Sequence, residues 1–251
     1  MEDLRTPTRP LPGAGGPGDG SVGLGPPAPL PDALSAPPPP VPTVRFVDPA
    51  ELARPMTVEP VTLEGRVVRL EPLGPDHLDG LAEVALDPAL WTLTAARIHS
   101  REDLDRWLAD AVRGREAGTE LPFATIDRAS GRPVGSSRYL NIDRRNRRLE
   151  IGWTWVAPAW QRTAVNSEAK LLMLEHAFER LGCHRVEFKT DSRNERSRRA
   201  LLRIGARQEG IFRNHVVMPD GRLRHSVYFS ITDEEWPAVA AGLRAGLARG
   251  R

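Results

Sequence analysis

Apolar and polar residues begin to alternate at Val61, and from there the pattern divides the chain into strands and helices. The segment VTLEGRVVRLEPL alternates on both sides of Gly65, which predicts a strand pair. Further apolar runs bounded by short polar turns predict more strands, the last two on either side of a turn at 219–221. The middle strands are LPFATID (121–127), PVGSSRYLNI (133–142), LEIGWTWVAP (149–158) and HRVEFKTD (184–191).

Apolar residues spaced three and four apart predict the helices. Ser100 and Asp103 form a start like a capping box, followed by apolar residues on one face. The segment 162–181 is apolar over so wide an arc that we expect it to pack against a sheet, and Gly182 ends it. The fold is predicted to be mixed α/β (α+β) with mostly antiparallel strands. Further helices are predicted at 76–85, 195–204 and 233–247.

Residues 1–58 show neither the two-residue period of a strand nor the 3.6-residue period of a helix. Sixteen of the 24 prolines fall before Val61, four of them consecutively at 37–40. Such a segment cannot bury enough apolar surface to offset the entropy of ordering it. We therefore expect a disordered Pro/Gly-rich tail at 1–58 and one folded domain at 59–251. Whether the tail docks a proline-reading partner stays open.

Charge and cysteine content narrow the function classes. A net charge of +2 is too close to balance for a protein that binds nucleic acid through charge alone. Lys170 and Lys189 are the only lysines among 35 basic residues. The single cysteine, Cys183, excludes an internal disulfide and a cysteine zinc cluster. We expect no metal and, since no apolar run is long enough to span a bilayer and no secretion signal is visible, a soluble cytoplasmic protein.

One segment, 149–178, combines strand, short loop and helix in a way that suits chemistry. The loop Gln161, Arg162, Thr163, Ala164, Val165 and Asn166 leads directly into the helix. A helix start presents unpaired N–H groups and the positive end of the helix dipole, which favours a pyrophosphate. Any strand–loop–helix unit has such a start, so this feature alone does not identify a ligand.

Four segments together resemble the GNAT superfamily of acyl-CoA-dependent N-acyltransferases, above all its RimJ/RimL-like branch of ribosomal-protein N-terminal acetyltransferases. The resemblance covers 61–236. It implies the GNAT fold, a mixed and mostly antiparallel sheet that is splayed between its central strands and has helices on both faces. It also implies acetyl-CoA as acyl donor. The four segments are VTLEGRVVRLEPL, EIGWTWVAPAWQRT, DSRNERSRRALLRIGA and DGRLRHSVYFSITDEEW.

The resemblance implies where the cofactor lies. Its pantetheine arm would enter the gap between the strand 150–156 and HRVEFKTD, and a backbone N–H near Thr154 to Val156 would polarise the thioester carbonyl. Two residues depart from the family's pyrophosphate motif: Ala164 replaces a glycine and Asn166 a small residue, which could weaken cofactor binding. Asn166 would either add a side-chain donor near the phosphates or cap the helix. The implied cofactor-binding residues are Thr154, Trp155, Val156, Gln161, Arg162, Thr163, Ala164, Val165, Asn166 and Asn194.

Catalysis needs a base for the attacking amine and an acid for the leaving thiolate. The resemblance implies Glu150 as the base, because it lies 11 residues before Gln161, the offset at which the family's histone-acetylating branch places its glutamate. Partial burial would raise its pKa toward a useful value. The alternative is a structural carboxylate paired with a nearby arginine. The family's usual tyrosine acid is replaced by Leu201, so Ser197 is the predicted acid, with Asn194 on the pantetheine. Alternatively, Ser197 is a surface hydroxyl and Asn194 a helix cap.

Several alternatives stay open. Trp153 and Trp155 are either core aromatics or lining of the acceptor pocket, and Tyr228 is either core or a substrate or acid group. Arginines at 144–148 and 193–203 could make the chain a non-catalytic RNA- or ribosome-binding module. The acyl donor could be larger than acetyl-CoA. The sequence indicates neither the oligomeric state nor whether the acceptor amine belongs to a small molecule or to a protein N-terminus; a membrane partner is not expected.

Overall fold

The computed structural model describes residues 43–250. Residues 1–42 of the predicted tail therefore lie outside the described residues. The chain divides into two units, Met1–Val47 and Asp48–Arg251, and the fold described below is that of the second unit. Within the described residues, no helix is both long and apolar enough to cross a membrane.

An eight-stranded sheet forms the second unit's framework, in the order β1-β2-β3-β4-β5-β6-β8-β7. All neighbours are antiparallel except β5 and β6, which are parallel. This confirms the predicted mixed, mostly antiparallel sheet. The strands are β1 Leu63–Glu64, β2 Val68–Pro72, β3 Leu121–Asp127, β4 Pro133–Asp143, β5 Arg148–Val156, β6 Arg185–Asp191, β7 Arg207–Val217 and β8 Leu223–Thr232.

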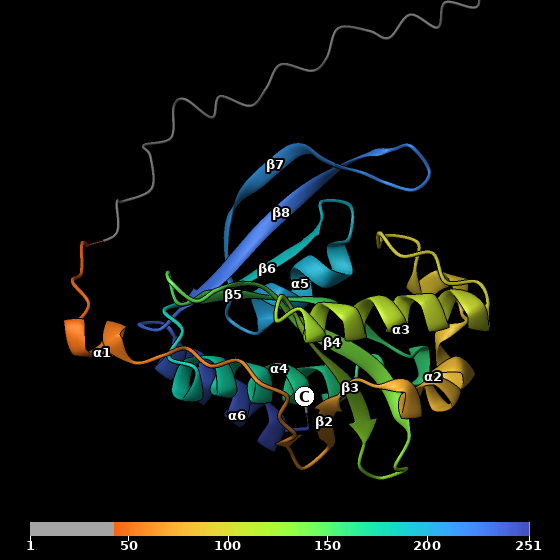
Figure 1. The fold of residues 1–251 in the computed structure, drawn as a ribbon, viewed down its shortest axis with the longest axis horizontal. Coiled ribbons are helices and arrows are strands. Elements are labelled where there is room, and N and C mark those ends of the chain that lie inside the picture. Colours follow the sequence, from red (N-terminus) through yellow and green to blue (C-terminus); the bar gives the residue numbers. More distant parts are fainter. Residues whose placement is uncertain (1–42, 251) are drawn as a thin grey trace, which may run out of the picture. The chain divides into compact units, whose positions relative to one another are not determined.

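Helices cover both faces of the sheet, as predicted (Figure 1). α4 and α6 pack side by side and contribute to one apolar core, while α2 and α3 enclose a second core on the other face. β7 and β8 form a long hairpin at one end of the sheet. The helices are α1 Pro49–Ala53, α2 Leu78–Ala85, α3 Arg101–Glu116, α4 Ala164–Glu175, α5 Glu195–Arg203 and α6 Trp236–Ala248, with 3-10 turns at Pro75–His77, Pro88–Leu90 and Pro158–Trp160 and a π-helical turn at His176–Arg180.

Local sequence signals set the ends of these helices. At the start of α3, the N–H of Asp103 donates to Ser100 Oγ, and that of Ser100 donates to the Asp103 carboxylate, both at 3.1 Å. The predicted capping box is thereby confirmed. α4 begins at Ala164 and continues through the π-helical turn, after which Gly182 turns the chain at φ +66°. A left-handed φ favours glycine, which explains the predicted helix end.

The predicted boundary at 58 is wrong, because the ordered unit begins at Asp48. The Asp48 carboxylate accepts from the N–H of Ala50 at 2.8 Å and caps α1, where Pro49 occupies a position that needs no N–H. Buried Arg147 donates to the carbonyl of Glu51 at 2.7 Å, and Met56 is 5% exposed in the first core. Proline content indicated a tail here, but these tertiary contacts supply the stabilisation that the local sequence lacks.

The parallel pair β5–β6 is short, and this confirms the predicted splay. Only three residue pairs join the two strands, the last being Glu150 with Glu187. β5 continues to Val156 and β6 to Asp191 without pairing to each other. Both strands therefore have unpaired edges that face a gap in the middle of the sheet.

A carboxylate on α4 fixes the first strands of the sheet. Glu168 is 5% exposed and accepts the N–H groups of Arg66, Val67 and Val68 at 2.9, 2.6 and 2.7 Å. The turn approaches so closely that a Cβ on Gly65 would lie 2.5 Å from a Glu168 oxygen. One side chain thus satisfies three backbone donors that the turn itself leaves without partners.

Replacing Glu168 by Ala should lower the free energy of unfolding by about 3 kcal/mol, since buried donors without partners are costly. Chemical denaturation monitored by circular dichroism measures this loss. Glu195→Ala is the matched control, because Glu195 is an exposed helical carboxylate with one exposed ion-pair partner; it should change stability by under about 0.5 kcal/mol. Equal effects of the two variants would contradict the proposed anchoring.

Candidate active site

β5 carries a bulge just beyond the last pair that it forms with β6. The register between β4 and β5 shifts between Ser136 and Arg138, so that Ser137 alone faces both Trp153 and Thr154. Trp153 takes the left-handed conformation at φ +50°, which is uncommon for a non-glycine residue. A bulge leaves one residue outside the hydrogen-bond ladder and bends the strand. The unpaired edge of β5 is therefore distorted where it faces the gap.

The two tryptophans of β5 have different surroundings. Trp155 is 5% exposed and its ring lies 6.2 Å from that of Trp107 in the second core. Trp153 is 37% exposed and packs on Arg138, whose guanidinium carbon is 5.1 Å from its ring and 4.7 Å from the ring of Trp107. Arg138 also pairs with Glu120 at 2.9 Å. The core interpretation thus fits Trp155, whereas Trp153 is partly open to solvent.

A buried lysine lies beneath the bulge, and the sequence patterns did not single it out as a site residue. Lys170, from α4, is 5% exposed, and its Nζ donates to Thr154 Oγ1 at 2.7 Å and to Ser137 Oγ at 3.2 Å. Its Nζ also lies 5.9 Å from the ring centroid of Phe188 on β6. Burial lowers the pKa of Lys170 from 10.5 to about 7. The one available signal was composition, since the chain has only two lysines.

Glu150, the predicted base, is a buried carboxylate at the point where β5 and β6 part. Its Oε2 accepts from Asn141 at 2.8 Å and pairs with Lys189 Nζ at 3.3 Å. The alternative of an arginine partner is wrong, because the other lysine of the chain occupies that position. Its Oε1 lies 3.0 Å from where a Cβ on Gly152 would be, so a glycine there leaves room for the carboxylate.

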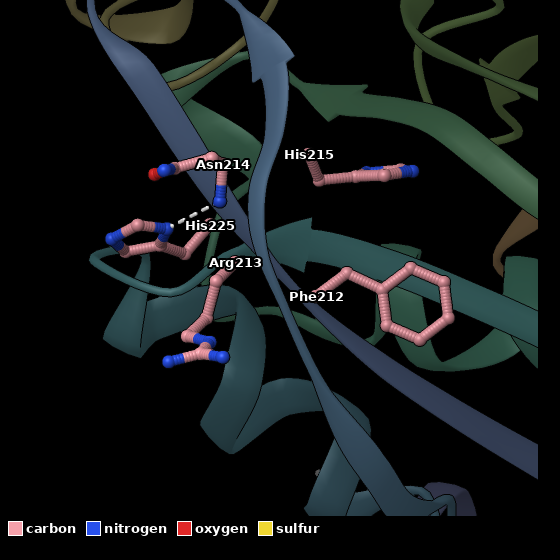
Figure 2. A pocket seen from close by; sticks show the side chains of 5 residues that line it. All are labelled: Phe212, Arg213, Asn214, His215 and His225. Carbon is pink, nitrogen blue, oxygen red and sulfur yellow. Dashed lines mark hydrogen bonds between the residues drawn. The ribbon is translucent and has the colours of Figure 1, made fainter.

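The hairpin of β7 and β8 closes the same face of the sheet with aromatic and polar side chains. A bulge in β7 with Asn214 at φ +49° lets Phe212 and His215 point to the same side of the strand (Figure 2). Tyr228 on β8 stacks against Phe212 at 4.5 Å and places its hydroxyl 3.5 Å from His215 Nε2. A cavity of about 710 Å³ is lined here by Phe212, Arg213, Asn214, His215 and His225.

Tyr228 lines a second, larger cavity of about 1040 Å³ together with Asn141 and Glu187. It is half-buried and therefore not a core residue, and its role as a substrate or acid group stays a prediction. Burial and the nearby charges of Glu150 and Glu187 raise its pKa. Burial and the nearby cations, Lys189 foremost, lower the pKa of His215. The face above Glu150 thus presents a neutral phenol and an imidazole whose neutral form is favoured.

The loop before α4 ends in a helix start that Thr163 caps. Thr163 caps the helix, accepting the N–H of Val165 at 3.3 Å and donating to the Trp160 carbonyl at 2.7 Å. The left-handed residue is Arg162, at φ +63°, whereas Ala164 is the first helical residue. The glycine that Ala164 replaces is therefore not needed for backbone conformation here. Asn166 lies within the helix, so the alternative that it caps the helix is wrong.

Two further predicted residues connect elements around the gap. Gln161 donates to the Val156 carbonyl at 2.8 Å and accepts from Arg196 at 2.6 Å, which joins the end of β5 to α5. Asn194 caps α5 by accepting the N–H of Ser197 at 3.0 Å. The cap interpretation of Asn194 is confirmed, and it leaves the amide nitrogen of the side chain for other contacts. Ser197 is half-buried in the first turn of α5.

The arginine clusters are largely engaged within the protein. Arg147 is 3% exposed and donates to backbone carbonyls, and Arg148 pairs with Asp143 at 3.3 Å and with Glu187 at 3.1 Å. Two of the arginines predicted to offer a phosphate-binding surface thus have internal partners. Within residues 43–250, no group of three His, Cys, Asp or Glu side chains is arranged to hold a metal ion.

Comparisons with known proteins agree with this geometry. A family model described as an acetyltransferase (GNAT) domain matches residues 68–207. A GCN5-related N-acetyltransferase from Brucella melitensis is 36% identical, with a TM-score of 0.70 over 75% of this chain and 86% of that one. Mycobacterium smegmatis RimJ, solved in complex with CoA-disulfide, is 25% identical, with a TM-score of 0.64 over 74% of this chain and 95% of that one.

Curated relatives are similar over a shorter stretch. YdaF of Bacillus subtilis, by its name a putative ribosomal N-acetyltransferase, is 33% identical over 96 residues, which is 38% of this chain and 51% of YdaF. YnaD of the same organism, named as an uncharacterized N-acetyltransferase, is 34% identical over 88 residues, 35% of this chain and 50% of YnaD. The chain thus spans about half the length of these curated relatives.

Lys170 should make stability depend on pH. Its folded-state pKa of about 7 is lower than that of an ordinary lysine, so between pH 7 and about 10.5 the unfolded chain binds the proton more tightly. Stability should rise with pH across this window, by at most about 1.4 kcal/mol per unit. Urea unfolding of wild type and Lys170→Met between pH 6 and 10 measures the difference between their slopes.

At pH 6 the methionine variant should be more stable than wild type by about 1–4 kcal/mol, since it removes a buried ammonium without an ion-pair partner. Arg244→Met, which alters an exposed cation of α6, is the control and should leave the slope unchanged. If wild type and Lys170→Met show the same pH dependence, the ammonium is not destabilised in the folded protein.

Proposed function

Because the chain belongs to the GNAT acetyltransferase family, we propose that it transfers an acetyl group from acetyl-CoA to a primary amine. The observation that carries this proposal is the gap between β5 and β6, with the bulge at Trp153 on its edge. A strand edge without a partner offers backbone N–H and C=O groups to an extended ligand. The amide-rich pantetheine arm is a ligand of that kind.

The residues around the gap fit the cofactor's parts. The N–H groups at the start of α4, with Thr163 as cap and Arg162 and Arg196 nearby, suit a pyrophosphate. The backbone of Trp155 and Val156 would hold the pantetheine, and an N–H of the bulge would polarise the thioester carbonyl. When bound, acetyl-CoA supplies an acyl group activated for attack by an amine.

The reaction forms a bond between the amine nitrogen and the acyl carbon and breaks the bond from that carbon to sulfur. The nitrogen loses a proton and the sulfur gains one. We assign the first proton to Glu150, which takes it directly or through a water molecule, with Tyr228 on the same face. Ser197, on the α5 side of the gap, is assigned as donor to the sulfur. Attack is direct, with both substrates bound at once.

For the acceptor, we propose an amine that enters over the β7–β8 hairpin, where His215 lines the smaller cavity, Tyr228 the larger one and Phe212 both. A protein N-terminus is the favoured source, because the neighbours include RimJ and a protein named as a ribosomal N-acetyltransferase. Cavities of about 710 and 1040 Å³ also have room for a small-molecule amine. The smallest acyl group, acetyl, is the proposed donor, and larger acyl-CoAs serve as competitors in the tests.

Calorimetric titration with acetyl-CoA and with free CoA should give micromolar binding in both cases. Ala164 is helical, so its methyl group does not distort the loop, and the anion-binding N–H groups keep their positions. A thiol-release assay with a panel of peptides and small amines then identifies the acceptor. Absence of binding at millimolar cofactor would contradict the proposed function and favour a binding module.

Glu150→Gln should lower kcat by about 10²-fold or more, since a positioned general base contributes that much, with little change in affinity for acetyl-CoA. Ser197→Ala should likewise lower kcat without weakening cofactor binding. Glu175→Gln is the control, because Glu175 lies at the far end of α4 and pairs with Arg244 on the surface. Full activity of Glu150→Gln across the pH range would eliminate Glu150 as the base.

A further inference from the structure

We propose that Lys170, acting through the hydroxyl group of Thr154, stabilises the negative charge that develops on the cofactor sulfur. This inference rests on the proposed function, because it concerns the leaving group of the same reaction. When the bond from the acyl carbon to sulfur breaks, its electron pair goes to the sulfur, which is then protonated. Lys170 is a positioning residue in this scheme: Thr154 donates a hydrogen bond to the sulfur, and Ser197 remains the donor of the proton that the sulfur gains.

The first argument is the position of Lys170. Its Nζ bonds to Thr154 on β5 and lies over the ring of Phe188 on β6. Both residues come after the last pair that joins the two strands, Glu150 with Glu187. The ammonium group therefore lies at the base of the gap, between the two strands that part there. A group in this position is directly below any ligand that fills the gap.

The second argument concerns the hydroxyl protons of Ser137 and Thr154 and which of them can be donated to a ligand. Lys170 donates to both hydroxyls, and Ser137 Oγ lies 2.7 Å from Thr154 Oγ1. Ser137 is 2% exposed and is enclosed by these partners and the Gly152 carbonyl, whereas Thr154 is exposed. When Ser137 donates to Thr154, the one acceptor within the described residues for the Thr154 proton is the Gly152 carbonyl at 3.5 Å, a long contact that a closer acceptor in the gap can replace. Two donors thus polarise one outward-facing hydroxyl.

The third argument is the uncompensated charge. Within residues 43–250, no carboxylate forms an ion pair with Lys170. The nearest carboxylate along α4, Glu168, is held by backbone N–H groups of the first turn, and Glu150 pairs with Lys189 on the opposite face of the sheet. The other titratable groups that face this region are Tyr139, bonded to the Met173 carbonyl, and His176, 3.3 Å from Tyr139. An ammonium held without a counterion favours an anion nearby.

The fourth argument is that position 170 holds a lysine and not an arginine. All but two of the 35 basic residues are arginines, and both lysines border the gap. Arginine does not release its proton in proteins, and its planar guanidinium needs more room than an ammonium. A lysine whose pKa lies near 7 changes charge in response to a neighbouring anion, so a negative sulfur would draw a proton onto Lys170.

The test compares the affinity of CoA with that of desulfo-CoA, which lacks the sulfur, by calorimetry at pH 6, where Lys170 is charged. Wild type should bind CoA about tenfold more tightly, the worth of one charge-assisted hydrogen bond. Lys170→Met and Thr154→Val should each lose this preference while retaining the affinity for desulfo-CoA. The double variant should lose no more than either single variant, because both act on the same bond.

The dependence of kcat on pH gives a second readout that a merely structural role would not change. The ammonium is the active form, so its contribution is lost as pH rises through about 7. Lys170→Arg keeps its charge and should lack this loss at high pH, while Lys170→Met should be slow at every pH. Because Lys170→Met is expected to be the more stable protein, reduced activity in that variant would not reflect unfolding.

The outcomes separate this inference from the proposed function. If wild type binds CoA and desulfo-CoA equally well and the variants match it, the role of Lys170 is wrong while the acetyltransferase proposal stands. If wild type binds neither molecule, both are wrong. A preference for CoA that disappears in Lys170→Met and Thr154→Val, but persists in the surface control Arg244→Met, supports the inference whichever amine is the acceptor.

Discussion

The interrupted pairing of β5 and β6 is the feature on which the candidate site depends. Three residue pairs hold the two strands together, and beyond Glu150 each strand continues with an unpaired edge. Unpaired backbone groups in the middle of a sheet are costly unless a ligand or solvent satisfies them. The gap therefore has a physical requirement that an extended, amide-containing ligand meets.

Several elements keep this gap open and shape it. The bulge at Trp153 bends β5 away from β6, and the guanidinium group of Arg138 packs against the Trp153 ring. Gln161 connects the end of β5 to Arg196 of α5, on the far side of the gap. The β7–β8 hairpin adds Tyr228 above Glu150. Polar or charged side chains make these contacts, so the site is set by polar contacts and by strand geometry as well as by apolar packing.

The two lysines, Lys170 and Lys189, have different partners in the site. Lys189 pairs with the buried carboxylate of Glu150 on the face of the sheet that carries Tyr228. Lys170 lies under the gap and has hydroxyl partners instead. Burying an ammonium without a carboxylate lowers stability, and such a cost is found where function requires it. The same residue that weakens the fold at neutral pH is the one best placed to act on a negative leaving group.

The sequence alone determined the elements and their order, because capping residues, glycines and hydrophobic periods act over a few residues. Ser100, Gly182 and the strand pair around Gly65 lie where the pattern indicates. The motif resemblance likewise indicated the gap and the loop before α4. Only the tertiary structure decided that Lys189 neutralises Glu150, that Arg147 holds residues 48–58, and that Lys170 lies beneath the bulge. Those contacts join residues up to about a hundred positions apart, and the burial that lowers the pKa of Lys170 arises only when α4 packs on the sheet.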